Sequence, residues 1–443
     1  MKKNRKYAVF CALFLTLCAV PAVGLVLFGP SAVGANEVLA AFPSLTRAGA
    51  VNWDFLSDLS RYVEDRFALR QEFITADAAL TAAIFGESRT NSVIFGQDGW
   101  LYYADTLADY QGSDPMTERE LWCAARNLAL MQEYAAARGA DFLFTSPPNK
   151  NTLYPQWMPV RYTRAETPGN WQRLMPYLEE MGVNYCDLTP VLLAADEPVY
   201  FKTDSHWDGC GSALAHDALV AALGGEAGLA GEAFTMSPHA GDLHEMLYPA
   251  GTQTEPGRIL ARPRSFQYVG NVRGPDDQMI HTTSAGTSGA LLMFRDSFGN
   301  LLHQDLAESF SEATFSRAMP VRMDLLAGEG TVIFELVERN LRNLAEKPPV
   351  MEGNQREMPE ICGEVEAALM IERGAHRDLP DLTVYTGTLD CAVLDVDSPI
   401  CVVLDSGVYE ASPTPEGFTL YAPPSETAEV LARCGGAWLR CAG

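Results

Sequence analysis

The chain has 443 residues, and its 57 acidic against 32 basic side chains give a formal net charge of −25. Hydrophobic residues make up 47% of the composition and charged residues 20%, which allows a sizeable core and excludes wholesale disorder, collagen-like chains and short disulfide scaffolds. Because phosphate contacts need clustered Lys and Arg, the acidity argues against a nucleic-acid partner and against polyanion binding over most of the surface.

The N-terminus carries an uneven charge pattern. Four of the first six residues are Lys or Arg, and an apolar run without charges follows over residues 7–28. A helix of that length spans a hydrocarbon core, and the cationic flank predicts a cytoplasmic N-terminus. We therefore predict a cytoplasmic tip and transmembrane anchor over residues 1–36, a single-pass protein of the cell membrane, and an extracytoplasmic catalytic domain. A cleaved signal peptide is the alternative, because Val33-Gly34-Ala35 resembles a small-residue cleavage site.

Beyond this run, apolar residues recur at helical spacing and in short strand-like runs. Helices are predicted over residues 52–67, 118–138, 171–181 and 209–223, and strands over 141–145, 184–188, 290–294 and 331–336. Residues 92–103 are predicted to form two short strands around a Gly-Gln-Asp-Gly turn. Residues 224–289 are predicted to be a loop-rich insert. The alternation of helices with short apolar strands favours an α/β domain built on a parallel sheet with helices on both faces.

A break at Lys347-Pro348-Pro349 precedes a C-terminal region of different character. A linker is predicted over residues 348–360, and a small β-rich module over residues 361–443. The β-like runs behind this prediction cover residues 382–385, 391–394, 400–404 and 417–421. Five cysteines lie in the module, so an oxidising compartment would allow one or two disulfides there. Free buried thiols are the alternative.

A polar segment, Arg295-Asp296-Ser297-Phe298-Gly299-Asn300, directly follows the apolar strand predicted at residues 290–294. In open parallel sheets, ligands and catalytic groups collect at the edge where the strands end. A serine held there can be exposed, and the neighbouring backbone N–H groups can stabilise an oxyanion. Ser297 is therefore a candidate nucleophile, which needs a base to take its proton. The alternative is that Ser297 belongs to an ordinary turn or helix N-cap.

A candidate base lies in a second polar segment, Thr203-Asp204-Ser205-His206-Trp207. Of the seven histidines, only His206 has a carboxylate two residues away in such a compact segment. Asp204 would orient the imidazole and stabilise its charged form, in the chain order Asp, His, Ser. A helix cap beside a surface histidine is one alternative. A metal site formed by Asp204, His206, His239 and His244 is another, although their spacing gives it no particular support; we predict no metal and no cofactor.

The two segments, in this order, resemble the DHHW and AlgX/AlgJ-like family, whose members have a permuted SGNH-hydrolase-like domain. The likeness covers about residues 40–345. Supporting pieces are residues 94–102, Pro148-Asn149-Lys150 with Tyr154-Pro155, and Glu335 with Glu338-Arg339. The resemblance implies an SGNH-like three-layer α/β/α domain with a parallel sheet over residues 37–347, and a triad of Asp204, His206 and Ser297. Ser205 stands where DHHW proteins often have a second histidine, a position that need not be catalytic.

The resemblance also implies an activity, the O-acetylation of a cell-envelope or secreted polysaccharide. A membrane-bound acyltransferase would be the partner that supplies the acetyl group. The backbone N–H of Ser297 is then the expected oxyanion donor, with Lys150, Arg295 and Arg339 as further support for the oxyanion or the substrate. Two alternatives stay open: a carbohydrate acetylesterase with the same triad, and a non-catalytic glycan-binding scaffold of the export machinery.

Overall fold

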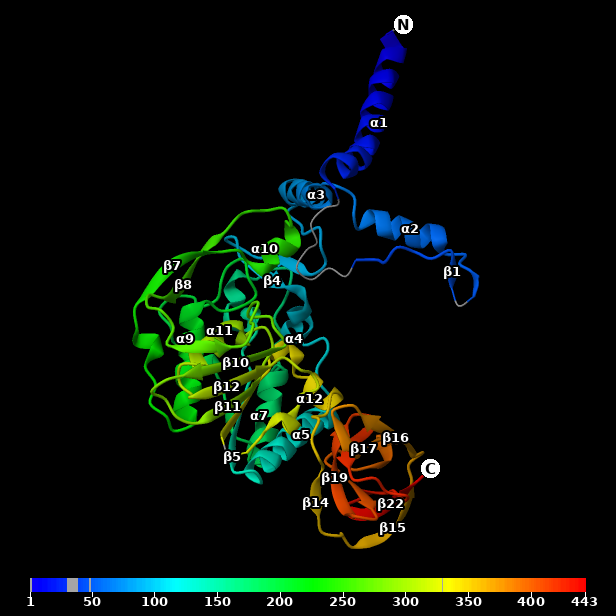
Figure 1. The fold of residues 1–443 in the computed structure, drawn as a ribbon, viewed down its shortest axis with the longest axis vertical. Helices are drawn as coiled ribbons and strands as arrows, with labels where there is room; N and C mark the ends of the chain where they lie inside the picture. Colours follow the sequence, from blue (N-terminus) through cyan, green and yellow to red (C-terminus); the bar gives the residue numbers. More distant parts are fainter. Residues whose placement is uncertain (1, 30–38, 48, 329) are drawn as a thin grey trace. The chain divides into compact units, whose positions relative to one another are not determined.

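A computed structural model describes residues 2–29, 39–47, 49–328 and 330–443 (Figure 1). The chain divides into two compact units, each made of several segments. Unit 1 comprises Met1–Ala104, Lys202–Ser205 and Pro238–Glu255, and unit 2 comprises Asp105–Phe201, His206–Ser237 and Pro256–Gly443. The domain boundaries inferred from the sequence stay a prediction. The two-stranded sheet of β7 (Phe234–His239) and β8 (Glu255–Leu260) has residues in both units.

Unit 1 is mostly helical, with two short hairpins. Its elements are α1 (Lys2–Phe28), β1 (Thr46–Arg47), β2 (Ala50–Val51), α2 (Phe55–Glu64), α3 (Arg70–Phe85), β3 (Val93–Phe95), β4 (Leu101–Tyr103) and α10 (Asp242–Leu247). The turn between β3 and β4 is predicted correctly, and Asp98 and Gly99 both have positive φ there. Leu243 and Leu247 of α10 pack against Val93 and Leu101 of this hairpin.

The predicted membrane anchor is contradicted. Residues 7–28 do form a helix, α1, but within the part of the chain that the structure describes no helix is both long and apolar enough to cross a membrane. A spanning helix needs about 20 consecutive, mostly apolar residues. The predicted localisation as a single-pass protein of the cell membrane with a cytoplasmic N-terminus is therefore wrong. The alternative cleavage site at residues 33–35 lies outside the described residues.

Unit 2 is built on a seven-stranded sheet with the order β6-β5-β13-β11-β12-β10-β9 (Figure 1). Its strands are β5 (Ala140–Thr145), β6 (Tyr185–Cys186), β9 (Phe266–Val269), β10 (Met279–Ser284), β11 (Ala290–Phe294), β12 (Glu312–Ser316) and β13 (Gly330–Glu335). The first five strands in this order are parallel, whereas β10 and β9 pair antiparallel. The sheet is thus mixed, not purely parallel, because the insert predicted to be loop-rich supplies β9 and β10.

The helices of unit 2 include those predicted over residues 118–138, 171–181 and 209–223. They are α4 (Leu107–Gln111), α5 (Glu118–Ala136), α6 (Lys150–Leu153), α7 (Asn170–Glu180), α8 (Thr189–Leu193), α9 (Gly209–Ala222), α11 (Gly299–Leu306) and α12 (Asn343–Glu346). The long helix α5 begins at a capping box, in which the Thr117 side chain accepts the Glu120 N–H and the Glu120 carboxylate accepts the Thr117 N–H. This exchange satisfies two N–H groups that a helix start leaves unpaired.

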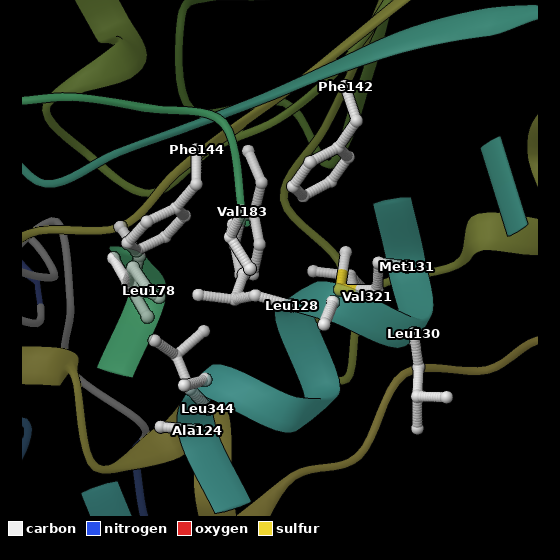
Figure 2. Packing of buried hydrophobic residues seen from close by; sticks show 14 of the residues in the cluster. Ala124, Leu128, Leu130, Met131, Phe142, Phe144, Leu178, Val183, Val321 and Leu344 are labelled. Atoms are coloured by element: carbon white, nitrogen blue, oxygen red, sulfur yellow. The ribbon is translucent and has the colours of Figure 1, made fainter. Parts of the chain in front are cut away.

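The central strands of the sheet are buried on both faces. Figure 2 shows Leu128 and Met131 of α5 in one cluster with Phe142 and Phe144, which point to the same face of β5. The intervening Leu143 points to the opposite face and is only 3% exposed. Burial on both faces explains why the central strands read as continuous apolar runs. This packing fixes the strand ends from which the candidate site residues project.

The C-terminal region is β-rich, as predicted. Its strands are β14 (Asn354–Arg356), β15 (Ile361–Glu366), β16 (Met370–His376), β17 (Leu379–Thr388), β18 (Ile400–Leu404), β19 (Gly407–Thr414), β20 (Gly417–Ala422), β21 (Glu429–Cys434) and β22 (Ala437–Ala442). The strand predicted at residues 391–394 is wrong, since Cys391–Val393 form a 3₁₀ turn capped by Asp390. All nine described cysteines are free thiols, so the disulfides considered for this region are not formed among the described residues.

Candidate active site

Ser297 lies in the turn between the central strand β11 and helix α11. The strand's hydrogen bonding extends one residue past its end, where the Arg295 N–H donates to Ser316 O at 2.9 Å. The Asp296 carboxylate then caps the turn by accepting the Phe298 N–H at 2.9 Å. A Cβ at Gly299 would lie 2.6 Å from the Arg295 side chain, so only glycine allows the helix to start this close to the strand.

His206 is brought to Ser297 by a local reversal of the chain. Tyr200 and Trp207 form an isolated antiparallel bridge, and the Phe201 N–H donates to His206 O at 3.1 Å. The imidazole packs against the Phe298 ring, with the ring centroids 4.8 Å apart. Its Nε2 lies 2.8 Å from Ser297 Oγ. With Nε2 as acceptor, this imidazole can take the hydroxyl proton during nucleophilic attack.

Asp204 belongs to unit 1 and is 5% exposed. Its Oδ2 accepts from His239 Nε2 at 2.8 Å and from the Asp242 N–H at 3.1 Å. Burial opposes charging of His239, but the hydrogen bond and charge of Asp204 outweigh it and raise the pKa of this imidazole. Ser205, the residue that departs from the DHHW pattern, is held by Asp242, which accepts both its N–H and its hydroxyl. The sequence analysis considered His239 only as a metal ligand and missed its contact with Asp204. Because the contact joins positions far apart in the chain, no local sequence pattern indicates it.

The three predicted basic supports differ in their surroundings. Arg295 is 4% exposed, and its guanidinium donates to Asn300 Oδ1 at 2.7 Å and to Pro275 O at 2.6 Å. Burial, followed by the charge of Arg317, lowers the pKa of Arg295 to about 10. The Arg339 guanidinium lies 5.5 Å from the centroid of the Phe298 ring, next to the candidate nucleophile. Lys150 is buried at the start of α6.

A pair of carboxyl groups lies behind the Ser297 turn, and sequence reasoning did not anticipate it. Glu335, the last residue of β13, is fully buried, and its Oε2 accepts the Asp296 N–H at 3.1 Å. Asp296 Oδ2 accepts the Val337 N–H at 2.9 Å and a weaker contact from Asn340 Nδ2 at 3.4 Å. Burial, with the charge of Asp296, raises the pKa of Glu335 well above its usual range.

A second buried acid, Glu338, ties the exit of β13 to the segment after β5. Its Oε2 accepts the Asn149 N–H at 2.7 Å and the Thr152 hydroxyl at 2.6 Å, while its own N–H donates to Pro147 O. Burial, followed by the charge of Asp109, raises the pKa of Glu338 to about 7. The side-chain amide of Asn149 is fully buried and has no hydrogen-bond partner within the described residues.

The α/β fold of this chain is SGNH hydrolase-like. Residues 93–285 match the family described as "SGNH hydrolase-like domain, acetyltransferase AlgX". The chain is 27% identical over 218 residues to "Probable alginate O-acetylase AlgJ" of Pseudomonas syringae pv. tomato, covering 46% of this chain and 54% of that protein. The resemblance to the AlgX/AlgJ-like proteins is thus confirmed.

The chain spans about half the length of this curated relative. Among solved structures, the "O-Acetyltransferase Domain of Pseudomonas putida AlgJ" is 17% identical with a TM-score of 0.39, over 57% of this chain and 92% of that chain. A DHHW family protein from Eubacterium siraeum is 14% identical with a TM-score of 0.42, over 59% of this chain and 98% of that chain.

Proposed function

We propose that this chain is an SGNH-like O-acetyltransferase that modifies a cell-envelope or secreted polysaccharide through an acyl-enzyme. The observation that carries the proposal is the 2.8 Å contact between His206 Nε2 and Ser297 Oγ at the carboxyl end of a central strand. The similarity to an acetyltransferase domain supports acetyl as the transferred group, and the similarity to a probable alginate O-acetylase supports a polysaccharide as the acceptor. The three-layer arrangement of the domain is part of the same proposal.

The proposed mechanism uses Ser297, His206 and Asp204 as a triad. Ser297 Oγ attacks the carbonyl carbon of the acetyl donor while His206 takes the hydroxyl proton. His206 then gives that proton to the leaving group, and an acetyl ester forms on Ser297. A sugar hydroxyl attacks this ester, His206 takes its proton, and Ser297 leaves and is reprotonated. Asp204 holds the imidazole in the correct tautomer and stabilises its charged form. A membrane-bound acyltransferase is proposed as the acetyl source.

The oxyanion formed in each step needs donors at the Ser297 turn. The Ser297 N–H has no acceptor within the described part of the chain, and α11 begins two residues later, so its positive end faces the same place. Arg339, beside Phe298, and Lys150 would bind polar groups of the substrate. Arg295 would act indirectly, because its guanidinium holds the turn through Asn300.

The test is intact mass analysis after incubation with an activated acetyl ester such as 4-nitrophenyl acetate. We expect one acetyl group on the wild-type chain and none on Ser297→Ala, with turnover reduced by at least about 10³-fold. Ser309→Ala is the matched control, because Ser309 also contacts a histidine, with His216 Nε2 2.7 Å from its hydroxyl. Equal acetylation of wild type and Ser297→Ala would overturn the assignment.

The acceptor separates the transferase from the esterase with the same triad. The acetyl-enzyme is offered oligosaccharides of increasing length, and its loss is compared with loss in buffer alone. A transferase moves acetyl to sugar faster than to water, whereas an esterase shows no acceleration by sugar. A chain that binds glycan but never forms the acetyl-enzyme would instead be the non-catalytic scaffold.

A further inference from the structure

We propose that Glu335 is a positioning residue whose side chain is a neutral carboxylic acid. Its carboxyl proton bridges to the Asp296 carboxylate and holds the turn that presents Ser297. The inference rests on the proposed function, since it assigns a task to a group that does not touch the substrate. It differs from the triad assignment because it concerns how a residue at the end of the neighbouring strand β13 supports the turn that carries the nucleophile.

The two oxygens of Glu335 are in different situations. Oε2 accepts the Asp296 backbone N–H at 3.1 Å. Oε1 is buried and has no hydrogen-bond partner among the described residues. A carboxylate charge with one hydrogen bond and no exposure would be strongly destabilising. A carboxylic acid at the same position has a hydroxyl that can donate, which removes the unpaired charge.

Asp296 is the neighbour that can accept this proton. Its two oxygens already take hydrogen bonds from the Phe298 N–H, the Val337 N–H and the Asn340 side chain. Two adjacent carboxyl groups, of which Glu335 is buried, do not readily both ionise, and the group that accepts more hydrogen bonds is the better place for the charge. Asp296 accepts three hydrogen bonds and Glu335 accepts one, so the proposal assigns the proton to Glu335. Burial and the charge of Asp296 raise the pKa of Glu335 well above its usual range, in agreement with this assignment.

Other charged and titratable groups near Glu335 do not reverse this assignment. Arg295 lowers the pKa of Glu335, but its charge is a weaker influence than burial and Asp296. Its guanidinium is also engaged with Asn300 and Pro275 O. Tyr200 is fully buried, and burial raises the pKa of its phenol well above 10, so it stays neutral.

The pair couples two turns that end neighbouring strands. Asp296 precedes Ser297 after β11, and Val337 and Asn340 follow β13. The Glu335 carboxyl group therefore closes a network that ties the Ser297 turn to the exit of β13. Loss of the proton would place two like charges side by side at the base of the Ser297 turn. The 2.8 Å contact of Ser297 with His206 would then be less well maintained.

The test compares the rate of acetyl-enzyme formation across pH for the wild type, Glu335→Gln and Glu335→Leu. The glutamine amide can donate to Asp296 and accept its N–H, but it cannot ionise. We expect Glu335→Gln to stay within about threefold of the wild type at neutral pH and to keep its rate at alkaline pH, where the wild type declines. We expect Glu335→Leu to be at least about tenfold slower at every pH. Thermal unfolding checks that each variant folds.

A Glu335→Gln variant as slow as Glu335→Leu, or one with the same alkaline decline as the wild type, overturns the proposal. If Glu335→Leu does not fold, the comparison of wild type with Glu335→Gln decides alone. Infrared spectroscopy separates this proposal from the proposed function. A protonated-carboxyl band in the wild type that is missing in Glu335→Gln supports the neutral acid even if no acetyl-enzyme forms, and absence of that band overturns it.

Discussion

At the scale of single residues, a serine–histidine contact does not by itself define a nucleophile. Unit 2 holds a second such contact, in which His216 lies 2.7 Å from Ser309 Oγ and 2.8 Å from Asp217. Asp217 also accepts three backbone N–H groups of residues 228–230, so it anchors a loop. Ser297 differs because it follows a central strand, precedes a helix and has a backbone N–H open to an oxyanion.

His303, beneath the Ser297 turn, gives a pH-dependent prediction. It is fully buried, its Nδ1–H donates to Gly299 O at 3.1 Å, and burial, then the charge of Arg295, lowers its pKa to about 4. In the unfolded chain the pKa is about 6.5, so between these values the unfolded state binds more protons and stability falls as pH falls. We expect protonation of this group in the unfolded chain to lower the free energy of unfolding by roughly 3 kcal/mol as the pH falls from about 7 to about 4. Urea unfolding of His303→Gln should lack that loss; an equal loss in both proteins would contradict the prediction.

The sequence predicts some of the site residues and cannot predict others, for a physical reason. Ser297, His206 and Asp204 each lie in a compact polar segment next to an apolar run, so the local pattern singles them out. The contacts of Glu335 with Asp296 and of His239 with Asp204 join residues distant in the chain. Only the folded arrangement of strand ends brings these groups together, and no local pattern carries that information.

At the scale of secondary-structure elements, the C-terminal region is joined to α5 by an ion cluster. Glu410 of β19 is 4% exposed and accepts two hydrogen bonds from Arg126, at 2.6 and 2.7 Å, and one from Arg356 at 2.7 Å. Asn127, one residue further along α5, donates to Pro413 O at the end of the same strand. The β-rich region, seen beside α5 in Figure 1, is therefore attached to the α/β part of unit 2 through specific polar contacts.

Removing the shared acid should weaken this junction strongly. Glu410→Ala leaves two arginines without their buried partner, and breaking such a pair costs about 3 kcal/mol or more of the free energy of unfolding. The matched control is Glu364→Ala, because the Glu364 side chain is 63% exposed in its pair with Arg440 and should contribute less than about 1 kcal/mol. Denaturant titration followed by circular dichroism measures both values. Similar small losses in the two variants would show that the cluster does not stabilise the fold.

The elements that the sequence predicts best are those with one dominant local signal. The central strands β11 and β18 fall at their predicted bounds because they are buried, continuous apolar runs. β10 escapes prediction because four of its six residues are polar, so its sequence has too few apolar side chains to stand out from a loop. Residues 391–394 are apolar yet not a strand, because the Asp390 side chain accepts the Ala392 N–H and favours a tight turn.

At the scale of the whole molecule, net charge constrains the acceptor. The chain carries a formal charge of −25, and a polyuronate acceptor for the proposed transferase would carry many negative charges of its own. Like charges slow encounter between enzyme and acceptor unless a local basic surface offsets them. Arg339 and Lys150 are the basic residues proposed at the site, too few to offset the charge of the whole chain. A neutral polysaccharide would not meet this barrier.

This repulsion predicts opposite salt responses for the two kinds of acceptor. The Debye length falls from about 30 Å at 0.01 M salt to about 8 Å at 0.15 M, which screens long-range repulsion but leaves short contacts in place. We expect kcat/KM for acetyl transfer to a polyuronate oligomer to rise several-fold over this range, and that for a neutral oligosaccharide of equal length to stay nearly constant. The rate of transfer is measured from the release of 4-nitrophenol at a fixed concentration of the acetyl donor. A fall in kcat/KM with salt for the polyuronate would instead reveal a basic groove that attracts it, and would make an anionic polysaccharide the favoured substrate despite the acidity of the chain.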